Sequence, residues 1–210
     1  APDFSYLKPK TVDECLSSLA AHGDSAQVLA GGQSLMPLLN FRLAAPAVLI
    51  DINGLDALSG IREDGDTISI GALERHEQIA GSPIVRRRLP LLADAAPHIA
   101  HVAIRARGTI GGSIALADPA AEWPACCLAL DARIELASVR GRRLVPAADY
   151  FQGLYTTVRE PDELVTAIKF AAPAPGHVHA FREISRRRGD FAIAGLALVA
   201  TRKNAALSDV

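Results

Sequence analysis

The sequence is poor in features that several protein classes require. Only 5% of its 210 residues are aromatic, and 22 Lys+Arg against 23 Asp+Glu leave a net charge of -1. This balance argues against binding to nucleic acid or to an anionic membrane, and the few aromatics argue against a base-stacking surface. No apolar run reaches the roughly 20 residues of a membrane span. The opening ten residues lack a basic head followed by an apolar stretch, so we predict no signal peptide and a cytoplasmic location.

Cysteine is also scarce, with only Cys15, Cys126 and Cys127. An odd number with two adjacent residues makes a poor disulfide framework, and an iron–sulfur cluster needs four ligands at workable spacing. His177 and His179 share one face if they lie in a strand, and a polar strand face is favoured over a metal site. We therefore predict no resident metal. With half of its residues apolar, the composition favours a globular chain with an ample core.

The first quarter alternates predicted strands and helices. Thr11 and Glu14 form a capping-box pattern that begins a helix, and Gly23 ends this helix. The predicted strands are 4–8, 27–30 and 48–52, with a second helix over 34–42. This alternation predicts a small, mainly parallel α/β unit.

The middle of the chain has a different pattern. Asp64-Gly65-Asp66 and Arg140-Gly141 lie between strand-like runs and predict two hairpins. We expect helices over 73–80, from Pro83 onward, over 89–96, and from a cap at Asp118-Pro119 through Leu130, followed by a strand over 164–170. These elements predict an α+β unit with an antiparallel sheet.

The chain closes with a linker and a short third unit. Residues 171–176 (Ala-Ala-Pro-Ala-Pro-Gly) are typical of a linker. Two predicted strands, 179–184 and 192–201, follow it around a basic turn at 186–188. Because two strands alone do not bury a core, we expect the chain to stop inside a third unit. The predicted division is 1–55, 56–172 and an incomplete 177–210.

Two glycine pairs indicate a ligand. They lie in the segments 30–34 (Ala-Gly-Gly-Gln-Ser) and 109–113 (Thr-Ile-Gly-Gly-Ser), which we predict to be loops. Glycine allows close backbone approach, and consecutive N–H groups together with hydroxyls bind anions. Each segment alone is typical of an ordinary turn, and neither matches the Gly-x-Gly-x-x-Gly or P-loop pattern. Together they favour a diphosphate-bearing ligand between two α/β units.

Two charged groups leave alternatives open. Asp118 and Glu122, four residues apart, are either a cap and a solvated acid or acceptors for ribose or adenine groups. Arg186 to Arg188 form either a solvated edge or a surface that docks a partner or tunes a cofactor. No Gly-x-Ser-x-Gly pattern is present, so we predict no catalytic nucleophile.

Three segments carry a family resemblance: VLAGGQSLMPLLNFRLAAPAVLIDI (28–52), IRARGTIGGSIALADPAAEWPACCLALDA (104–132) and FREISRRRGDFAIAGLAL (181–198). In this order, the chain resembles the FAD-binding (medium) subunit of molybdenum-containing hydroxylases, the family of aerobic carbon monoxide dehydrogenase and xanthine dehydrogenase. The resemblance implies an α+β protein. Its two α/β subdomains would have the PCMH-type FAD-binding fold, followed by the start of a C-terminal α+β flavoprotein domain.

The resemblance also implies where each residue would act. Ala30, Gly31, Gly32, Gln33 and Ser34 would hold the FAD pyrophosphate with Leu35 near the flavin, and Thr109, Ile110, Gly111, Gly112 and Ser113 would form the second phosphate segment. Glu122 would lie toward adenosine, Ile99 and Val158 would line the site, Arg182 would match a FAD-contacting lysine, and Asp190 and Phe191 would lie near the flavin ring.

The implied function is that of an oxidoreductase subunit. Electrons would pass from a partner subunit with a molybdenum cofactor, through a small partner with 2Fe–2S clusters, to FAD here and on to an external acceptor. Neither glycine segment contains His or Cys, so we expect non-covalent FAD, held weakly if the chain truly ends at Val210. The alternatives are a non-catalytic nucleotide-binding or cofactor-assembly module and a stand-alone FAD oxidoreductase.

Overall fold

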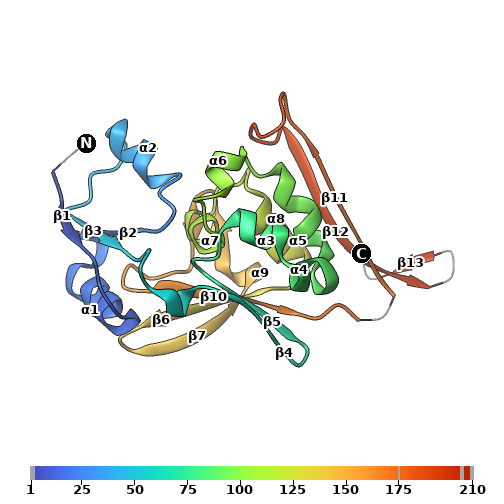
Figure 1. Ribbon diagram of the computed structural model, residues 1–210, viewed down its shortest axis with the longest axis horizontal. Helices are drawn as coiled ribbons and strands as arrows, with labels where there is room; N and C mark the ends of the chain where they lie inside the picture. Colours follow the sequence, from blue (N-terminus) through green and yellow to red (C-terminus); the bar gives the residue numbers. More distant parts are fainter. Residues whose placement is uncertain (1–2, 175, 204–205, 209–210) are drawn as a thin grey trace.

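The computed structural model describes residues 3–174, 176–203 and 206–208. Along the chain, a parallel three-stranded sheet is followed by an antiparallel five-stranded sheet and then by an antiparallel three-stranded sheet (Figure 1). Helices cover one face of the central sheet. The predicted α+β fold class is confirmed.

The first unit contains the predicted parallel sheet, in strand order β1-β3-β2. Its elements are β1 (Ser5–Leu7), α1 (Val12–His22), a 3₁₀ turn (Gly23–Ser25), β2 (Ala26–Leu29), α2 (Leu35–Asn40) and β3 (Val48–Asp51). The Thr11 hydroxyl caps α1 by accepting the N–H of Glu14 at 3.1 Å. Gly23 ends the helix at φ +48°, a conformation that favours glycine. All four residues of β3 are buried, as expected for the central strand of a parallel sheet.

The second unit is built on the antiparallel order β4-β5-β10-β6-β7. Its strands are β4 (Ile61–Asp64), β5 (Thr67–Gly71), β6 (Arg133–Ser138), β7 (Gly141–Pro146) and β10 (Leu164–Ala171), with a ribbon of β8 (Phe151–Gly153) and β9 (Thr156–Thr157). Its helices are α3 (His76–Gly81), α4 (Pro83–Arg88), α5 (Pro90–Ala95), α6 (Val102–Arg105), α7 (Ile110–Leu116), α8 (Glu122–Ala129) and α9 (Ala147–Tyr150), with 3₁₀ turns at Asp56–Leu58 and Ala96–His98. The main core lies between the sheet and these helices.

The prediction around the second glycine pair was wrong. The pair lies in the first turn of α7, a helix that the sequence did not predict, and Thr109 is the N-cap that accepts the N–H of Gly112 at 3.2 Å. Helix propensity disfavours two adjacent glycines, but packing decides here. A Cβ added to Gly111 would lie 2.5 Å from the Cβ of Ala72, so only glycine lets α7 approach the end of β5 this closely.

Two other predicted helix starts were also wrong. Asp118 does not cap α8, which begins at Glu122; the Asp118 carboxylate instead accepts the N–H of Ala120 at 2.9 Å in a turn. The helix predicted from residue 73 begins at His76 because Arg75 is paired with Thr109 in an isolated β-bridge. The short helix α6 was not predicted at all.

The third sheet contains β11 (His177–Ile184), β12 (Ala194–Lys203) and β13 (Ala206–Ser208). Its first two strands confirm the prediction; β13 was not predicted. The sheet packs against α5 and α8, and buried Phe181 contacts the ring of His98 with centroids 5.1 Å apart. Residue 171 ends β10, so it belongs to the sheet rather than to the linker. Residue 175 of the predicted linker lies outside the described residues.

The three-way division of the chain stays a prediction. The core of the first unit includes Leu58, Leu73, Ala137 and Leu164, which the chain supplies from beyond residue 55. The first two units therefore share a buried apolar contact. Within the described ranges, no helix is long and apolar enough to cross a membrane, and no group of three or more His, Cys, Asp or Glu side chains is arranged to hold a metal ion.

Candidate functional site

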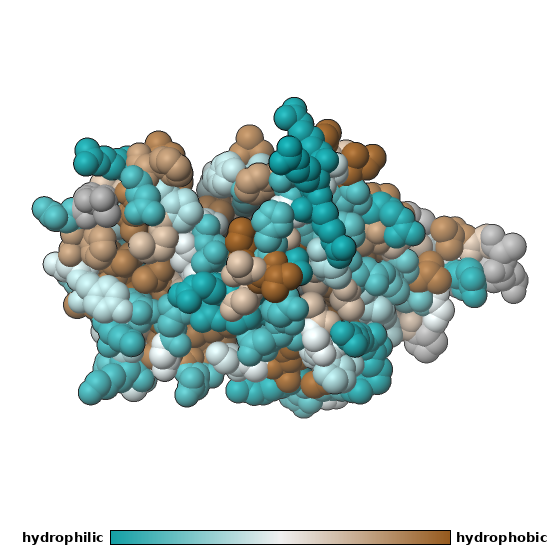
Figure 2. Space-filling view, turned by 45° about the horizontal axis from the view of Figure 1, so that its top comes forward, coloured by the Kyte–Doolittle hydropathy of each residue, from teal (hydrophilic) through white to brown (hydrophobic). Residues whose placement is uncertain are grey.

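A cavity of about 1090 Å³ lies between the first unit and the helices of the second, where Figure 2 shows the surface hollowed beside the left-hand lobe. Pockets for drug-sized ligands hold roughly 300–1,000 Å³, so the space suits a larger, extended ligand. Both glycine-pair segments line this cavity, one from each unit. Folding therefore brings together the two segments that the sequence singled out.

The first segment leaves β2 and enters α2. Gly32 has φ +72°, which a residue with a side chain rarely adopts. Gly31 is buried so closely against the carbonyl of Arg107 that it has no room for a Cβ. The Ser34 hydroxyl has no hydrogen-bond partner in the described part of the chain. The segment thus presents backbone and a free hydroxyl to the cavity.

The second segment approaches from the opposite wall. Gly112 and Ser113 line the cavity from the first turn of α7, and Thr109, which caps this helix, also lines it. Among residues 3–174, 176–203 and 206–208, the Ser113 hydroxyl has no partner either. Both walls carry unpartnered hydroxyls that can donate to phosphate oxygens, and small residues beside them allow close approach of a ligand.

A network of hydrogen bonds joins the two walls behind the first segment. Asn53 donates from Nδ2 to the carbonyl of Ala30 at 2.7 Å and to Asp51 Oδ1 at 2.7 Å. Arg75 donates from Nη2 to Asn53 Oδ1 at 2.8 Å and from Nη1 to the carbonyl of Arg107. Asn53 and Arg75 thus connect the first glycine segment to the strand and loop that precede the second.

One end of the cavity is acidic. Asp118 and Glu122 both line it, and burial raises the pKa of Glu122 to about 7. Glu183 and Asp118 add to this rise because their charges disfavour a second nearby carboxylate. A ligand that donates hydrogen bonds to the ionised carboxylate of Glu122 would therefore lower the pKa of this residue.

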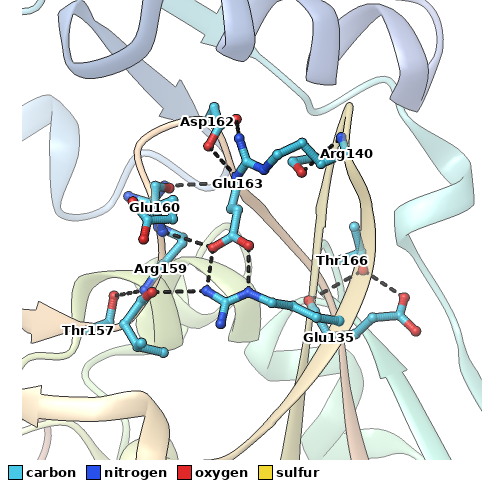
Figure 3. Close-up of polar contacts among 11 residues, drawn as sticks. Glu135, Arg140, Thr157, Arg159, Glu160, Asp162, Glu163 and Thr166 are labelled. Atoms are coloured by element: carbon cyan, nitrogen blue, oxygen red, sulfur yellow. Dashed lines mark hydrogen bonds and ion pairs between the residues drawn. The ribbon is translucent and has the colours of Figure 1, made fainter.

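Another wall comes from the turn before β10. Arg159 and Glu163 line the cavity. The carboxylate of Glu163, which Figure 3 labels, accepts two hydrogen bonds: Arg143 donates from Nε to one oxygen at 2.6 Å and from Nη2 to the other at 2.7 Å. Arg159 donates to the main-chain carbonyls of Glu160 and Glu163, and Arg140 pairs with Asp162. These contacts brace the turn without filling the cavity.

The basic turn between β11 and β12 reaches the far end of the cavity. Asp190 and Phe191 line it, and the Phe191 side chain is 75% exposed. Gly189, at φ +88°, lies against the carbonyl of Ala100 and the ring of His101, where an added Cβ would be only 2.7 and 2.8 Å away. Glycine at this position lets the turn fold down onto the second unit.

The structure brings together nearly all the residues predicted for the site. The predicted residues that line the cavity are Ala30, Gly31, Gly32, Gln33, Ser34, Leu35, Ile99, Thr109, Gly111, Gly112, Ser113, Asp118, Glu122, Asp190 and Phe191. Ile110 instead lies in the core, Val158 packs against it, and Arg182 is exposed and donates to the carbonyl of Phe181 at 2.7 Å. These last three residues are not part of the cavity wall.

Sequence reasoning missed His76 and His101, which also line the cavity. His76 belongs to α3, and its buried ring accepts the indole N–H of Trp123 at Nδ1 across 2.9 Å. Neither residue lies in a glycine segment, so no motif drew attention to them. The β-bridge between Arg75 and Thr109, which aligns α3 with the second segment, leaves no pattern in the sequence.

Comparison with known proteins identifies the family. Residues 2–173 match the FAD binding domain in molybdopterin dehydrogenase. The chain is 44% identical over 200 residues to the 6-hydroxypseudooxynicotine dehydrogenase complex subunit alpha of Paenarthrobacter nicotinovorans, covering 95% of this chain and 68% of the relative. It is 43% identical to the carbon monoxide dehydrogenase medium chain of Hydrogenophaga pseudoflava, covering 100% of this chain and 73% of the relative.

A solved structure agrees with the sequence matches. Carbon monoxide dehydrogenase from Hydrogenophaga pseudoflava, in a form lacking the Mo-pyranopterin moiety, superimposes with a TM-score of 0.96 at 44% identity. The match covers 99% of this chain and 72% of that one. The resemblance seen in the sequence is therefore confirmed: the chain belongs to the family of FAD-binding domains of molybdopterin dehydrogenases, which are oxidoreductases.

Proposed function

We propose that the cavity holds one FAD molecule, extended between the two glycine segments and bound without a covalent link. The observation that carries this proposal is the pairing of small residues with the unpartnered hydroxyls of Ser34 and Ser113 on opposite walls of a single cavity. The cavity volume and this donor set both fit a dinucleotide. FAD, when bound, supplies the chemistry of accepting and passing on electrons; the chain binds, orients and shields it.

Different residues of the cavity would contact different parts of FAD. The pyrophosphate would lie between residues 30–34 and 109–113, where the hydroxyls of Ser34 and Ser113 line opposite walls of the cavity. Glu122 and Asp118 would accept hydrogen bonds from the adenosine end. Leu35, Asp190 and Phe191 would border the flavin ring, and the exposed ring of Phe191 would control access to it. Ile99 adds an apolar surface.

We further propose that the chain acts as the electron-transfer subunit of a molybdenum hydroxylase. Electrons would arrive from a partner with 2Fe–2S clusters, which a molybdenum-cofactor subunit reduces during substrate hydroxylation, and would leave for an external acceptor. Cys15, Cys126 and Cys127 are all buried, which agrees with clusters carried by another chain. We place this complex in the cytoplasm. The alternatives of a cofactor-assembly module and a stand-alone oxidoreductase are not favoured by the family match.

The test is a titration of the purified, flavin-free 210-residue chain with FAD, followed by flavin fluorescence and absorbance. We expect saturable binding of one FAD per chain, weaker binding of FMN, which lacks the adenosine half, and complete release of FAD after acid precipitation. Failure of the folded chain to bind FAD would overturn the site. Flavin that stays with the precipitate would overturn the non-covalent link and point to His76 or His101.

A further inference from the structure

The tautomer of His76 is set by a single neighbour. The indole N–H of Trp123 is only a donor, and it lies 2.9 Å from His76 Nδ1. Nδ1 must therefore accept, so the proton of the neutral ring resides on Nε2. The two rings lie 5.9 Å apart between centroids with a tilt of 53°, and Trp123 is only 1% exposed. The ring of His76 is thus fixed both in orientation and in protonation.

His76 also stays neutral at physiological pH. Burial, together with the nearby charges of Arg75 and Arg105, lowers the pKa of His76 to about 4. The side chain is 6% exposed and lines the cavity. Its Nε2–H is therefore a neutral donor whose strength does not change between about pH 5 and pH 8.

The Nε2 atom has no hydrogen-bond partner within the described ranges, and it is accessible to solvent. Its neighbour is Gly108, where an added Cβ would lie 2.6 Å from Nε2. Gly108 lines the cavity immediately before the second glycine segment. Only glycine at this position leaves room for the Nε2 edge of the ring, and both residues line the cavity. If the ring served only to pack the core, its Nε2–H would be expected to have a hydrogen-bond partner within the protein.

We propose that His76 is a further FAD-binding residue, which donates its Nε2–H to an acceptor oxygen of the bound FAD beside the second glycine segment. Trp123 is its positioning residue, since it acts only through the His76 ring. The acceptor is a phosphate or ribityl oxygen, which share the same hydrogen-bond chemistry. This inference rests on the proposed function, because it requires FAD in this cavity.

The direct test needs no variant. Two-bond ¹H–¹⁵N spectra of the isotopically labelled chain should show His76 as the Nε2-protonated neutral tautomer at pH 7, before and after FAD is added. The Nε2 resonance should shift on FAD binding while Nδ1, paired with Trp123, stays in place. A titration with ADP and with riboflavin then distinguishes the oxygens, because ADP carries phosphates without a ribityl chain and riboflavin carries a ribityl chain without phosphate. FAD that binds without moving Nε2 would overturn the proposal.

Variants give an independent readout. His76→Phe keeps a ring but removes the donor, and we expect the dissociation constant of FAD to rise about tenfold or more, as for one lost hydrogen bond to a charged or polar oxygen. His76→Gln retains an N–H donor and should recover part of that loss. Equal FAD affinity of folded His76→Phe and wild-type chains would refute the role of His76, whereas a wild-type chain that binds no FAD would refute the proposed function itself.

Discussion

Arg75 and Asn53 meet across the junction of the first two units, where Nη2 of the arginine lies 2.8 Å from Oδ1 of the asparagine. Neither residue lies in a glycine segment, and neither lines the main cavity. Their second contacts reach the carbonyls of Ala30 and Arg107, one from each wall. The pair therefore links the two walls through hydrogen bonds.

Loss of this pair should weaken FAD binding more than folding. In Asn53→Ala, the carbonyl of Ala30 and one N–H of Arg75 lose their hydrogen-bond partner. Both groups lie near the surface, so water can replace that partner. We expect unfolding free energy to fall by about 1 kcal/mol and the dissociation constant of FAD to rise roughly tenfold, because the first segment loses its support. Urea unfolding and flavin fluorescence titration measure the two effects.

Asn40→Ala is the matched control for this change. Asn40 is exposed at the end of α2 and makes no hydrogen bond through its side chain in the described part of the chain. Its loss should alter neither stability nor FAD affinity. If Asn53→Ala and Asn40→Ala bound FAD equally well, the network behind the segment would have no part in binding.

Gly112→Ala should separate helix stability from ligand binding. Gly112 lies within α7 at a negative φ and is exposed to the cavity. Replacing it by alanine should therefore stabilise the helix by about 1 kcal/mol. The added Cβ would sit 2.9 Å from Thr109 Oγ1 and crowd the cap beside the proposed pyrophosphate. We expect an equal or higher Tm with FAD affinity reduced at least tenfold.

The control is Gly81→Ala at the end of α3, where a Cβ meets nothing within 4 Å. This variant should share any helix-propensity effect and leave FAD binding unchanged. Gly32 is less informative, because its φ of +72° makes any side chain strained regardless of the ligand. Wild-type affinity in Gly112→Ala would remove the second glycine segment from the binding site.

The sequence predicted those parts of the fold that depend on local signals. The cap at Thr11, the turn glycine at position 65 and the proline after Ser82 each act within a few residues, and their elements form as expected. The second glycine segment shows the limit of such reasoning. Local propensity predicts a loop there, but α7 forms because Gly111 fits against Ala72, a contact between residues far apart in the chain.

The same distinction applies to the site. The glycine segments could be predicted because their small residues occur in recognisable runs. His76 could not, because its proposed role depends on Trp123, 47 positions later, and on the missing side chain of Gly108. The network of Asn53 and Arg75 was equally hidden, since it reaches the two walls through the main-chain carbonyls of Ala30 and Arg107, which no residue type encodes.

Arg143 and Glu163 give a prediction for acid stability. Burial alone would raise the pKa of Glu163, but the hydrogen bonds from Arg143 and from the N–H of Glu160 outweigh burial and hold it below its usual value. The pair therefore contributes stability above about pH 4.5, and this contribution is lost as the pH falls through the lowered pKa. Arg143→Met should cost about 2 kcal/mol at pH 7 and less as the pH falls below about 4.

Arg142→Met is the control, because Arg142 lies on the same strand and pairs with Glu135 while its side chain is 60% exposed. We expect it to change the unfolding free energy by less than about 0.5 kcal/mol. Urea unfolding of both variants between pH 3 and pH 7 measures the difference. A constant gap between wild type and Arg143→Met down to pH 3 would contradict the assigned pair.

Glu122 couples the stability of the empty chain to FAD binding. With a pKa of about 7 in the folded chain against an ordinary value near 4.5, the unfolded chain releases this proton first. Stability therefore falls as the pH rises from about 4.5 through 7, and Glu122→Gln should remove this slope and stabilise the flavin-free chain at pH 8 by about 2 kcal/mol.

A carboxylate that accepts hydrogen bonds from adenosine hydroxyls should in turn have its pKa lowered by FAD. FAD should then bind more tightly at pH 8 than at pH 6 in the wild type but not in Glu122→Gln, and identical pH profiles would show that Glu122 does not face the ligand.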